Sequence, residues 1–347
     1  MKTHVWSVDN FVDKLESYPQ ITQAATLLKN NEVVAFPTET VYGLGGNAES
    51  DEAVAKIFGA KGRPADNPLI IHIAETAQLE AFTSGIPQSA AILMETFWPG
   101  PLTIVLKKKE GKLSELATAG LSTVAVRMPA HPLALALIKQ SGLPIAAPSA
   151  NVSGKPSPTL ARHVEEDLTG KIAGIVDGGP TGVGLESTVI DCTEVVPVIL
   201  RPGGITKEQI EEVIGKVSVD PALKNAEATP KSPGMKYRHY APNAPLFLVN
   251  GSHAFLQKLV TEQQAEGKKV GILTTEEAVH DYQADLILAC GQRNKLETVA
   301  TSLYDTLRSF NDAEIDVIFS EIFPEEGVGQ AIMNRLSKAA ANQVITE

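Results

Sequence analysis

A cluster of prolines between residues 220 and 245 constrains the fold of this 347-residue chain more than any other feature. The prolines in this stretch are Pro221, Pro230, Pro233, Pro242 and Pro245. Proline breaks helices and lacks the backbone N–H that a central strand needs, so regular secondary structure cannot run through the stretch. We therefore predict an extended linker over residues 220–245, with one domain on each side.

Before the linker, apolar runs of strand length alternate with stretches that have the apolar spacing of amphipathic helices. The predicted strands are Val33–Phe36, Leu69–Ile73, Leu102–Leu106, Thr123–Val126, Ile145–Ala147, Gly174–Val176 and Thr188–Ile190. The predicted helices are Ile21–Lys29, Glu52–Ala60, Ser89–Phe97 and Pro132–Ser141. This alternation predicts an α/β domain over residues 1–219.

After the linker, the same alternation resumes on a smaller scale. The predicted strands are Leu246–Val249, Val270–Leu273, Asp285–Leu288 and Asp316–Phe319, and the helices between them include Ser252–Glu266 and Lys295–Phe310. Strands separated by helices are typical of a parallel sheet. We therefore predict a small parallel-sheet domain over residues 246–347.

Composition excludes several classes of protein. A formal net charge of −11 argues against a protein that coats nucleic acid, because neutralising phosphates needs surplus Lys and Arg. The sequence has no apolar run of about 18 residues for a membrane helix, and residues 1–10 lack the apolar stretch of a secretion signal. Cys192 and Cys290 are far apart and show no metal-type spacing. We expect a cytoplasmic protein with free thiols.

The first polar motif follows the first predicted strand. Pro37–Gly45 brings hydroxyls and glycines to the carboxyl end of that strand, where open α/β sheets usually bind ligands. Lys61 and Arg63 come later in a segment bounded by Gly62 and Pro64, where an extended backbone would point both cations to one side. The pair is either a phosphate clamp or a solvated basic patch, and the spacing alone leaves both open.

Five more strands bear polar groups at or near their ends. His72 interrupts the apolar run Leu69–Ile73, and Arg127 closes another strand just before Pro129. Ser149 follows a third strand, Ser187 leads into a fourth, and Arg201 leaves a fifth. An arginine in such a place needs a carboxylate, phosphate or water partner. Together these ends predict one cleft.

No standard nucleotide or catalytic motif explains that cleft. The sequence contains no Gly-x-x-x-x-Gly-Lys-Ser/Thr, no Gly-x-Gly-x-x-Gly after the first strand, and no Gly-x-Ser-x-Gly. His and acidic pairs at metal-ligand spacing are also missing, so we expect no metal held by the protein itself, although Mg²⁺ could arrive with a nucleotide.

The sequence contains the motifs Pro37–Leu44, Lys61–Pro64, Pro99–Thr103, Pro148–Asn151 and Arg201–Gly203, in this order. Taken together, these motifs resemble the Sua5/YrdC family of threonylcarbamoyl-AMP synthases. Ser232–Tyr240 resembles the linker of the long Sua5 type, so the resemblance covers nearly the whole chain. It implies a YrdC-like domain with a twisted mixed sheet, an extended linker, and a smaller Rossmann-like C-terminal α/β domain.

The resemblance implies that L-threonine, bicarbonate and ATP are converted to threonylcarbamoyl-AMP and pyrophosphate. This product is the activated intermediate for N6-threonylcarbamoylation of adenosine in tRNAs that read codons beginning with A, a step carried out by a separate transferase. Whether this chain itself contacts tRNA stays open. Positioning and charge neutralisation dominate in such chemistry, and no general base is evident in the sequence.

The resemblance also implies the site residues. The L-threonine pocket falls on Thr40, His72, Arg127, Ala147 and Ser187, with Arg127 expected to meet the substrate carboxylate. The ATP site falls on Arg63, Asn67, Thr123, Ser149, Ser157, Arg201 and Tyr237, with Lys61 as a further phosphate-positioning residue beside Arg63. Because Tyr237 lies in the proline-bounded linker, we expect the linker to act as a lid over the nucleotide.

Two other functions are compatible with parts of the sequence. A non-catalytic RNA-binding module would need a basic face, and the densest basic run is Lys107–Lys109 with Lys112, which lacks neighbouring aromatics. A carbamoyltransferase that uses carbamoyl phosphate would share a YrdC-like domain. It would be expected to carry zinc-finger segments too, and the paired cysteines for these are missing.

Overall fold

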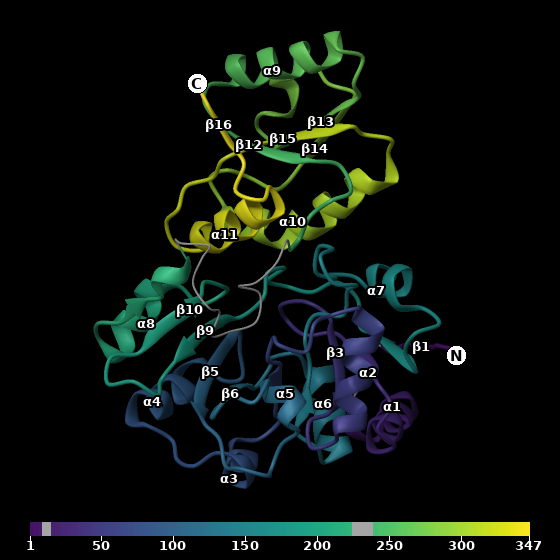
Figure 1. Ribbon diagram of the computed structural model, residues 1–347, viewed down its shortest axis with the longest axis vertical. Coiled ribbons are helices and arrows are strands. Elements are labelled where there is room, and N and C mark those ends of the chain that lie inside the picture. Colours follow the sequence, from purple (N-terminus) through teal and green to yellow (C-terminus); the bar gives the residue numbers. More distant parts are fainter. Residues whose placement is uncertain (9–14, 224–238) are drawn as a thin grey trace. The chain divides into compact units, whose positions relative to one another are not determined.

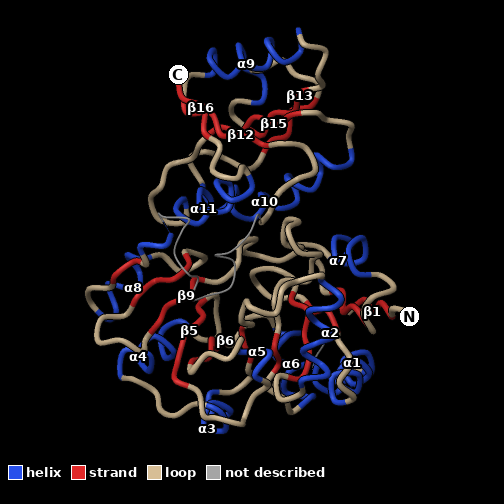
Figure 2. Tube along the Cα trace, viewed as in Figure 1, coloured by secondary structure: helices blue, strands red, loops and turns tan. Residues whose placement is uncertain are grey.

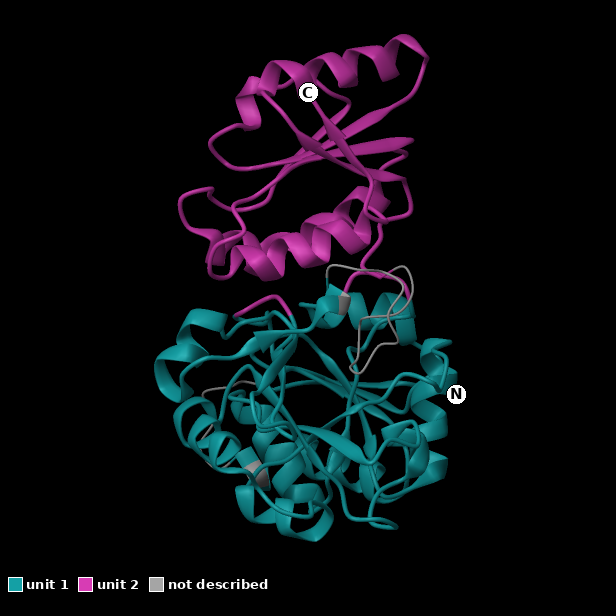
Figure 3. Ribbon diagram, turned by 60° about the vertical axis from the view of Figure 1, so that its left-hand side comes forward, with its two compact units in different colours: residues 1–153, 158–182, 186–236 teal, residues 154–157, 183–185, 237–347 magenta. Residues whose placement is uncertain are grey.

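The computed structural model describes residues 1–8, 15–223 and 239–347. The chain forms two compact units, which Figure 3 shows in different colours. Unit 1 comprises residues 1–153, 158–182 and 186–236, and unit 2 comprises residues 154–157, 183–185 and 237–347. Two short segments of the N-terminal part are therefore grouped with unit 2. Residues 224–238, the centre of the predicted linker, lie outside the described part, so the limits of that linker stay a prediction.

Unit 1 is built on one twisted mixed sheet (Figure 1). Its described strands are β1 (His4–Ser7), β2 (Val34–Phe36), β3 (Gly43–Asn47), β4 (Ile70–His72), β5 (Leu102–Lys107), β6 (Thr123–Arg127), β7 (Ile145–Ala146), β8 (Gly174–Asp177), β9 (Thr188–Asp191), β10 (Val198–Arg201) and β11 (Ser218–Val219). Their order across the sheet is β1-β8-β2-β3-β7-β4-β6-β5-β9-β10-β11. The sheet contains both parallel pairs, such as β4 with β6, and antiparallel pairs, such as β5 with β6, which confirms the predicted mixed sheet.

The helices of unit 1 connect these strands (Figure 2). They are α1 (Pro19–Lys29), α2 (Asp51–Lys61), α3 (Leu79–Phe82), α4 (Gln88–Phe97), α5 (Glu115–Thr118), α6 (Pro132–Ser141), α7 (Ala161–Leu168) and α8 (Lys207–Ile214). Short 3₁₀ turns lie at Leu15–Ser17, Thr76–Gln78 and Pro221–Leu223. All four helices predicted for this domain are present, within a few residues of their expected ends. Among the described residues, no helix is both long and apolar enough to cross a membrane.

The sheet of unit 1 has a separate apolar core on each face. On one face, α2, α4, α7 and α8 contribute Ile57, Leu93, Val164 and Ile210 to a large core. On the other face, α1 and α6 pack against β2, β7 and β8 through residues such as Leu28. Successive residues of a strand point to opposite faces, so a strand between two cores must be apolar on both sides.

The second face changes character along the sheet. Where β4, β5, β6 and β9 continue it, only a small apolar cluster remains, formed by Ile70, Val105, Ala125, Val189 and Leu200. The other positions of these strands on that face are polar. This half of the face therefore has the composition of a binding surface.

Strand β3 is the main element that the sequence pattern did not predict, since the glycine-rich motif Pro37–Gly45 was not assigned to a strand. It pairs with β2 and β7 in the interior of the sheet. Glycine is unfavourable in strands, but here the absence of its side chain leaves space for side chains of the neighbouring strands. A Cβ at Gly45 would lie 2.7 Å from Phe36 and 2.8 Å from Ile145. The glycines thus allow a large ring from the neighbouring strand to pack across β3.

Unit 2 is a three-layer α/β domain. Its strands are β12 (Leu246–Asn250), β13 (Val270–Thr274), β14 (Leu286–Ala289), β15 (Val317–Glu321) and β16 (Val344–Thr346), in the order β14-β13-β15-β12-β16. All the pairings are parallel, which confirms the predicted sheet. Helix α9 (His253–Ala265) covers one face, and α10 (Leu296–Ser309) and α11 (Gly329–Ala339) cover the other (Figure 1). The short edge strand β16 is the one that the sequence pattern did not reveal.

The packing around β3 leads to a test with a matched control. We expect Gly45→Ala to lower the free energy of unfolding by about 1–3 kcal/mol, because a new methyl group would overlap Phe36 and Ile145. Gly59→Ala, in α2, should instead raise it by about 0.5–1 kcal/mol, since nothing lies within 4 Å of the new Cβ and alanine favours the helix. Urea denaturation of both variants measures these changes. Equal effects of the two substitutions would contradict the tight packing of β3.

Candidate functional site

Strand register brings four of the polar side chains into one row across the sheet. His72 on β4 pairs with Arg127 on β6. On β5, Thr103 lies one residue before Ile104, which pairs with Val126, so it lies beside Arg127 on the same face. Thr103 in turn pairs with Val189 of β9, two residues after Ser187. The row His72, Arg127, Thr103 and Ser187 occupies the polar half of the second sheet face.

Arg127 is the central cation of this row and is almost completely buried. Its Nη1 donates to Thr40 Oγ1 at 2.9 Å, and its Nε donates to the carbonyl of Gly100 at 3.2 Å. Nη2 forms an ion pair with Glu39 at 2.7 Å. A buried guanidinium needs such compensation, since an unpaired buried charge is strongly destabilising. These contacts fix Arg127 against the segment that follows β2.

The Thr38–Thr40 turn is held by its own hydroxyls. Thr38 Oγ1 donates to the carbonyl of Val41 at 2.6 Å and lies 2.9 Å from Thr40 Oγ1. The backbone N–H groups of Thr40 and Val41 donate to Thr38 Oγ1. Thr40 is thereby positioned to accept the hydrogen bond from Arg127.

His72 is a neutral ring in this environment. Burial, together with the nearby charge of Arg127, lowers the pKa of His72 to about 3. Its Nδ1 lies 3.2 Å from the carbonyl of Ile70, and its ring meets Phe36 edge-on at 6.3 Å between centroids. At neutral pH the imidazole therefore offers hydrogen bonds but no charge.

A second buried arginine lies beside Ser187. Nη2 of Arg201 donates to the carbonyl of Ser187 at 2.9 Å and to Ser187 Oγ at 3.2 Å. Ser187 Oγ in turn lies 2.7 Å from Thr103 Oγ1. The pairing of β10 with β9 shifts register between Ile199 and Arg201, and a shift of this kind redirects a side chain at the end of a strand. Two buried arginines on one face make this half of the sheet suited to anionic ligands.

Lys61 does not extend toward the sheet face. Its side chain is buried, and Nζ donates to the backbone carbonyls of Ser149 and Asn151, both at 2.5 Å. Ser149 Oγ donates to Asn151 Oδ1 at 2.5 Å. The two motifs Lys-x-Arg and Ser-x-Asn are thus joined, with the ammonium holding the Ser149–Asn151 loop. The hydrogen bonds of Lys61 Nζ and of the Ser149 and Asn151 side chains together fix this loop in place.

The remaining predicted nucleotide residues are spread along the same domain. Arg63 is half-buried, and its Nη2 lies 3.4 Å from the carbonyls of Asn67 and Pro68. The side chain of Asn67 is buried. Thr123 opens β6 on the face that carries Arg127, four residues away at the opposite end of the strand. Arg63 and Asn67 are therefore brought together.

Three further residues of the predicted site are Ala147, Ser157 and Tyr237. The backbone N–H of Ala147 donates to the carbonyl of Ile70 at 2.9 Å, beside His72. Ser157 is buried in the segment 154–157, which is grouped with unit 2. Tyr237 lies outside the described residues, as does the core of the predicted lid. Ala147 thus joins the His72 end of the row.

Sequence reasoning missed Glu39 and Thr103. Thr103 interrupts the apolar strand Leu102–Leu106, and this is the signal that singled out His72 in its own strand. Glu39 lies inside the quoted motif Pro37–Leu44, yet nothing in its spacing indicates a partner as distant in sequence as Arg127.

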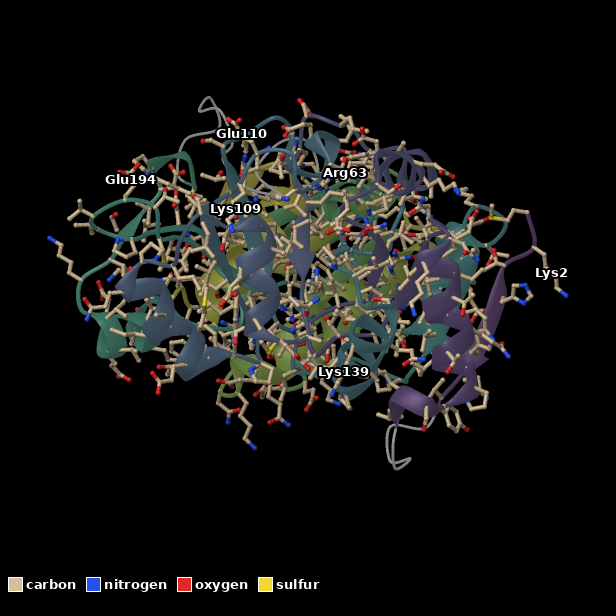
Figure 4. The ribbon with its side chains drawn as sticks, turned by 90° about the horizontal axis from the view of Figure 1, so that it is seen from below. Lys2, Arg63, Lys109, Glu110, Lys139 and Glu194 are labelled. Atoms are coloured by element: carbon tan, nitrogen blue, oxygen red, sulfur yellow. The ribbon has the colours of Figure 1, made fainter. Side chains whose placement is uncertain are left out.

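The basic run Lys107–Lys112 does not form a separate basic face. Lys108 is paired with Glu115 at 2.8 Å, and Lys109 Nζ donates to the carbonyl of Glu80 at 2.5 Å. In the view of Figure 4, Lys109 is flanked by the acidic Glu110, and Lys2 and Glu194 lie on opposite sides of the ribbon.

Among the described residues, no group of three or more His, Cys, Asp or Glu side chains could hold a metal ion.

Two family models match the chain. The one described as "Telomere recombination", for the Sua5, YciO and YrdC proteins, matches residues 26–203. The one described as "Threonylcarbamoyl-AMP synthase, C-terminal domain" matches residues 205–341. The first match covers most of unit 1, and the second begins just before α8 of unit 1 and continues through most of unit 2.

Full-length relatives agree with these matches. A threonylcarbamoyl-AMP synthase of Bacillus subtilis is 61% identical over 99% of this chain and 100% of its own length. One from Pyrococcus abyssi is 50% identical over 97% of this chain and 98% of its own. The crystal structure of P. abyssi Sua5 complexed with L-threonine superposes with a TM-score of 0.94 at 49% identity, covering 99% of this chain and all of the other.

The buried His72 makes stability depend on pH. Because its folded-state pKa lies far below its unfolded value, the unfolded chain binds a proton that the folded chain does not, and stability falls as the pH falls below about 6.5. Between about pH 7.5 and pH 5.5 this contribution amounts to about 1.4 kcal/mol. On lowering the pH over this range, we expect the free energy of unfolding of His72→Asn to fall by about 1.4 kcal/mol less than that of wild type.

Urea denaturation at the two pH values measures the difference. His4→Asn, which changes an exposed histidine, should retain the pH dependence of wild type. An unchanged pH dependence in His72→Asn would mean that His72 takes up protons in the folded protein as freely as in the unfolded one.

Proposed function

This chain belongs to the Sua5 family of threonylcarbamoyl-AMP synthases, and we propose that the polar row of unit 1 is where it holds L-threonine against ATP. The enzyme joins L-threonine, bicarbonate and ATP into threonylcarbamoyl-AMP and pyrophosphate, the activated intermediate for tRNA modification. The observation that carries the proposal is the placement of two buried arginines, Arg127 and Arg201, on the polar half of the second sheet face.

The threonine pocket consists of Thr40, His72, Arg127, Ala147 and Ser187. Arg127 supplies a fixed cation for the substrate carboxylate, because a guanidinium matches a carboxylate in geometry. The bound L-threonine in the P. abyssi Sua5 structure supports an amino-acid site in this fold. The hydroxyls of Thr40 and Ser187 and the neutral ring of His72 are available to read the polar groups of the side chain.

The ATP site consists of Arg63, Asn67, Thr123, Ser149, Ser157, Arg201 and Tyr237. Arg201 lies next to Ser187, so a phosphate bound there is near the threonine pocket. Lys61 is a positioning residue in this scheme, since its ammonium holds the carbonyls of Ser149 and Asn151. The residues that contact the phosphates are then Arg63 and Arg201.

The chemistry demands proximity and charge neutralisation. The carbamate of threonine is an anion that must approach the α-phosphorus of ATP, which is itself surrounded by negative oxygens. Holding both reactants in line lowers such a barrier by roughly 7–11 kcal/mol, and fixed cations stabilise the developing charge. Arg63 and Arg201 supply that positive field.

We also propose that Mg²⁺ enters with ATP, because this ion is usually held by phosphate oxygens with few protein ligands. The product passes to a separate transferase that modifies tRNA. A net charge of −11 supports release of the intermediate to that transferase rather than a broad tRNA-binding face on this chain. The two free, buried thiols, Cys192 and Cys290, support a cytoplasmic site of action.

A pyrophosphate-release assay tests this function. Release should require L-threonine, bicarbonate and ATP together, and Arg127→Lys should lower kcat/KM for threonine by on the order of 10- to 100-fold, since a lysine cannot reproduce the paired contacts of the guanidinium. The control Arg162→Lys changes an exposed arginine and should retain full activity. Turnover with carbamoyl phosphate in place of bicarbonate would point to a carbamoyltransferase instead.

Selectivity for the threonine hydroxyl gives a second test. A site that hydrogen-bonds a substrate hydroxyl rejects analogues that lack it, because its own polar groups would lose their partner. We expect 2-aminobutyrate to be used on the order of 100-fold or more less efficiently than threonine, and Ser187→Ala to narrow that ratio. Comparable kcat/KM values for the two amino acids in wild type would place the pocket elsewhere.

A further inference from the structure

The carboxylate of Glu39 is buried beside Arg127 and makes little use of its hydrogen-bonding capacity. Only 16% of its side chain is exposed, and both carboxylate oxygens are inaccessible to solvent. Oxygen Oε1 lies 2.7 Å from Nη2 of Arg127, but this ion pair lacks hydrogen-bond alignment. Among the described residues, neither oxygen of Glu39 accepts a hydrogen bond.

A carboxylate in this state is suited to a ligand that donates hydrogen bonds. An ionised carboxylate has about four acceptor positions, and burying it without partners carries a large desolvation cost. Arg127 cancels the charge of Glu39 but leaves these acceptor positions open. A cationic donor group on the ligand would fill them.

The two opposite charges match the two charged groups of an amino acid. In solution threonine is a zwitterion, with an ammonium and a carboxylate attached to the same carbon. We infer that Glu39 receives the ammonium of L-threonine while Arg127 receives its carboxylate, and that Glu39 then takes the proton which the amine must lose. This inference rests on the threonine pocket proposed above.

The step balances with bicarbonate as the only co-reactant. One N–H proton of the ammonium passes to the Glu39 carboxylate, which leaves a free amine. The nitrogen lone pair attacks the carbon of bicarbonate, an N–C bond forms, and hydroxide leaves with the second N–H proton as water. The products are the carbamate of threonine, water and protonated Glu39, which later returns its proton to solvent. A base placed within reach of the proton is what such a step needs.

Two ionisable groups in the described part of the chain act on Glu39. Arg127 on β6 forms the ion pair, and the charge of Glu39 acts on His131, which precedes α6 and accepts a hydrogen bond from the N–H of Leu133. Burial lowers the pKa of His131, against the opposing effect of the Glu39 charge, so its ring is neutral near pH 7. His72 is neutral as well. Within the described part of this cluster, Glu39 is thus the carboxylate whose unused acceptor positions lie beside Arg127, where the ammonium would be held.

Ligand pairs separate this role from simple support of Arg127. The probes are L-threonine and (2S,3R)-2,3-dihydroxybutanoate, which has a hydroxyl in place of the amine, with binding measured by calorimetry. We expect Glu39→Gln to weaken threonine binding about 10- to 100-fold and to change binding of the hydroxy acid less than about 3-fold. Equal losses for both ligands would show that Glu39 only holds Arg127, which would overturn the inference.

The pH dependence of turnover tests the proton transfer. In Glu39→Gln, pyrophosphate release should fall about 10-fold or more near neutral pH and should recover as the pH rises toward the pKa of threonine's own amine, where the free amine no longer requires a base. Glu39→Asp should retain part of the activity. A loss in Glu39→Gln that is the same at every pH would contradict a role as base.

Two variants guard against misreading these results. Glu49→Gln makes the same chemical change at an exposed position and should match wild type in both assays. Arg127→Lys should weaken both ligands. If it does so while Glu39→Gln changes neither ligand nor the pH profile, the pocket stands and the role of Glu39 is wrong. If Arg127→Lys affects neither ligand, the threonine pocket itself is wrong.

Discussion

The compensation of buried arginines on one sheet face is the constraint on which the site depends. Arg127 is buried, so the fold must bring it partners: Thr40 and the carbonyl of Gly100 accept hydrogen bonds from it, and Glu39 balances its charge. These partners belong to segments that are far from Arg127 in the sequence, and the charge of Arg127 holds them in place. Removing one partner of a buried charge lowers the free energy of unfolding by more than the complete pair contributes to it, because the remaining charge is left buried and uncompensated. The turn after β2 and the end of β6 are therefore fixed together.

Lys61 plays the corresponding part for the neighbouring loop. The sequence Lys-x-Arg suggests two equivalent phosphate ligands, yet the buried ammonium of Lys61 holds the carbonyls of Ser149 and Asn151, whereas Arg63 stays half-exposed. A compact ammonium with three donors is suited to tie carbonyls from one loop, and a guanidinium is suited to grip an anion. The two cations of one motif can thus divide the tasks of shaping the site and binding in it.

Elements with a strong pattern were predictable from the sequence, and contacts between remote residues were not. The strands around Leu102–Lys107 and Thr123–Arg127 follow from their apolar runs. The polar residues on separate strands predicted one cleft, and in the structure His72, Arg127 and Ser187 share one sheet face. Strand β3 was missed because its glycines serve the packing of Phe36, a tertiary requirement. Glu39 was missed because its partner lies 88 residues away, and no local period records such a pairing.

A carboxylate such as Glu39 is unfavourable in a site that holds two anions, a carbamate and a nucleotide. Two like charges about 4 Å apart repel by about 4 kcal/mol at the effective dielectric constant of a protein surface. Arg127 offsets this while the substrate is a zwitterion, and a proton taken from the ammonium removes the negative charge of Glu39 when the carbamate forms. The negative charge of Glu39, which would repel the carbamate, is therefore lost in the step that forms the carbamate. The cations Arg127 and Arg201 are then left facing an anion.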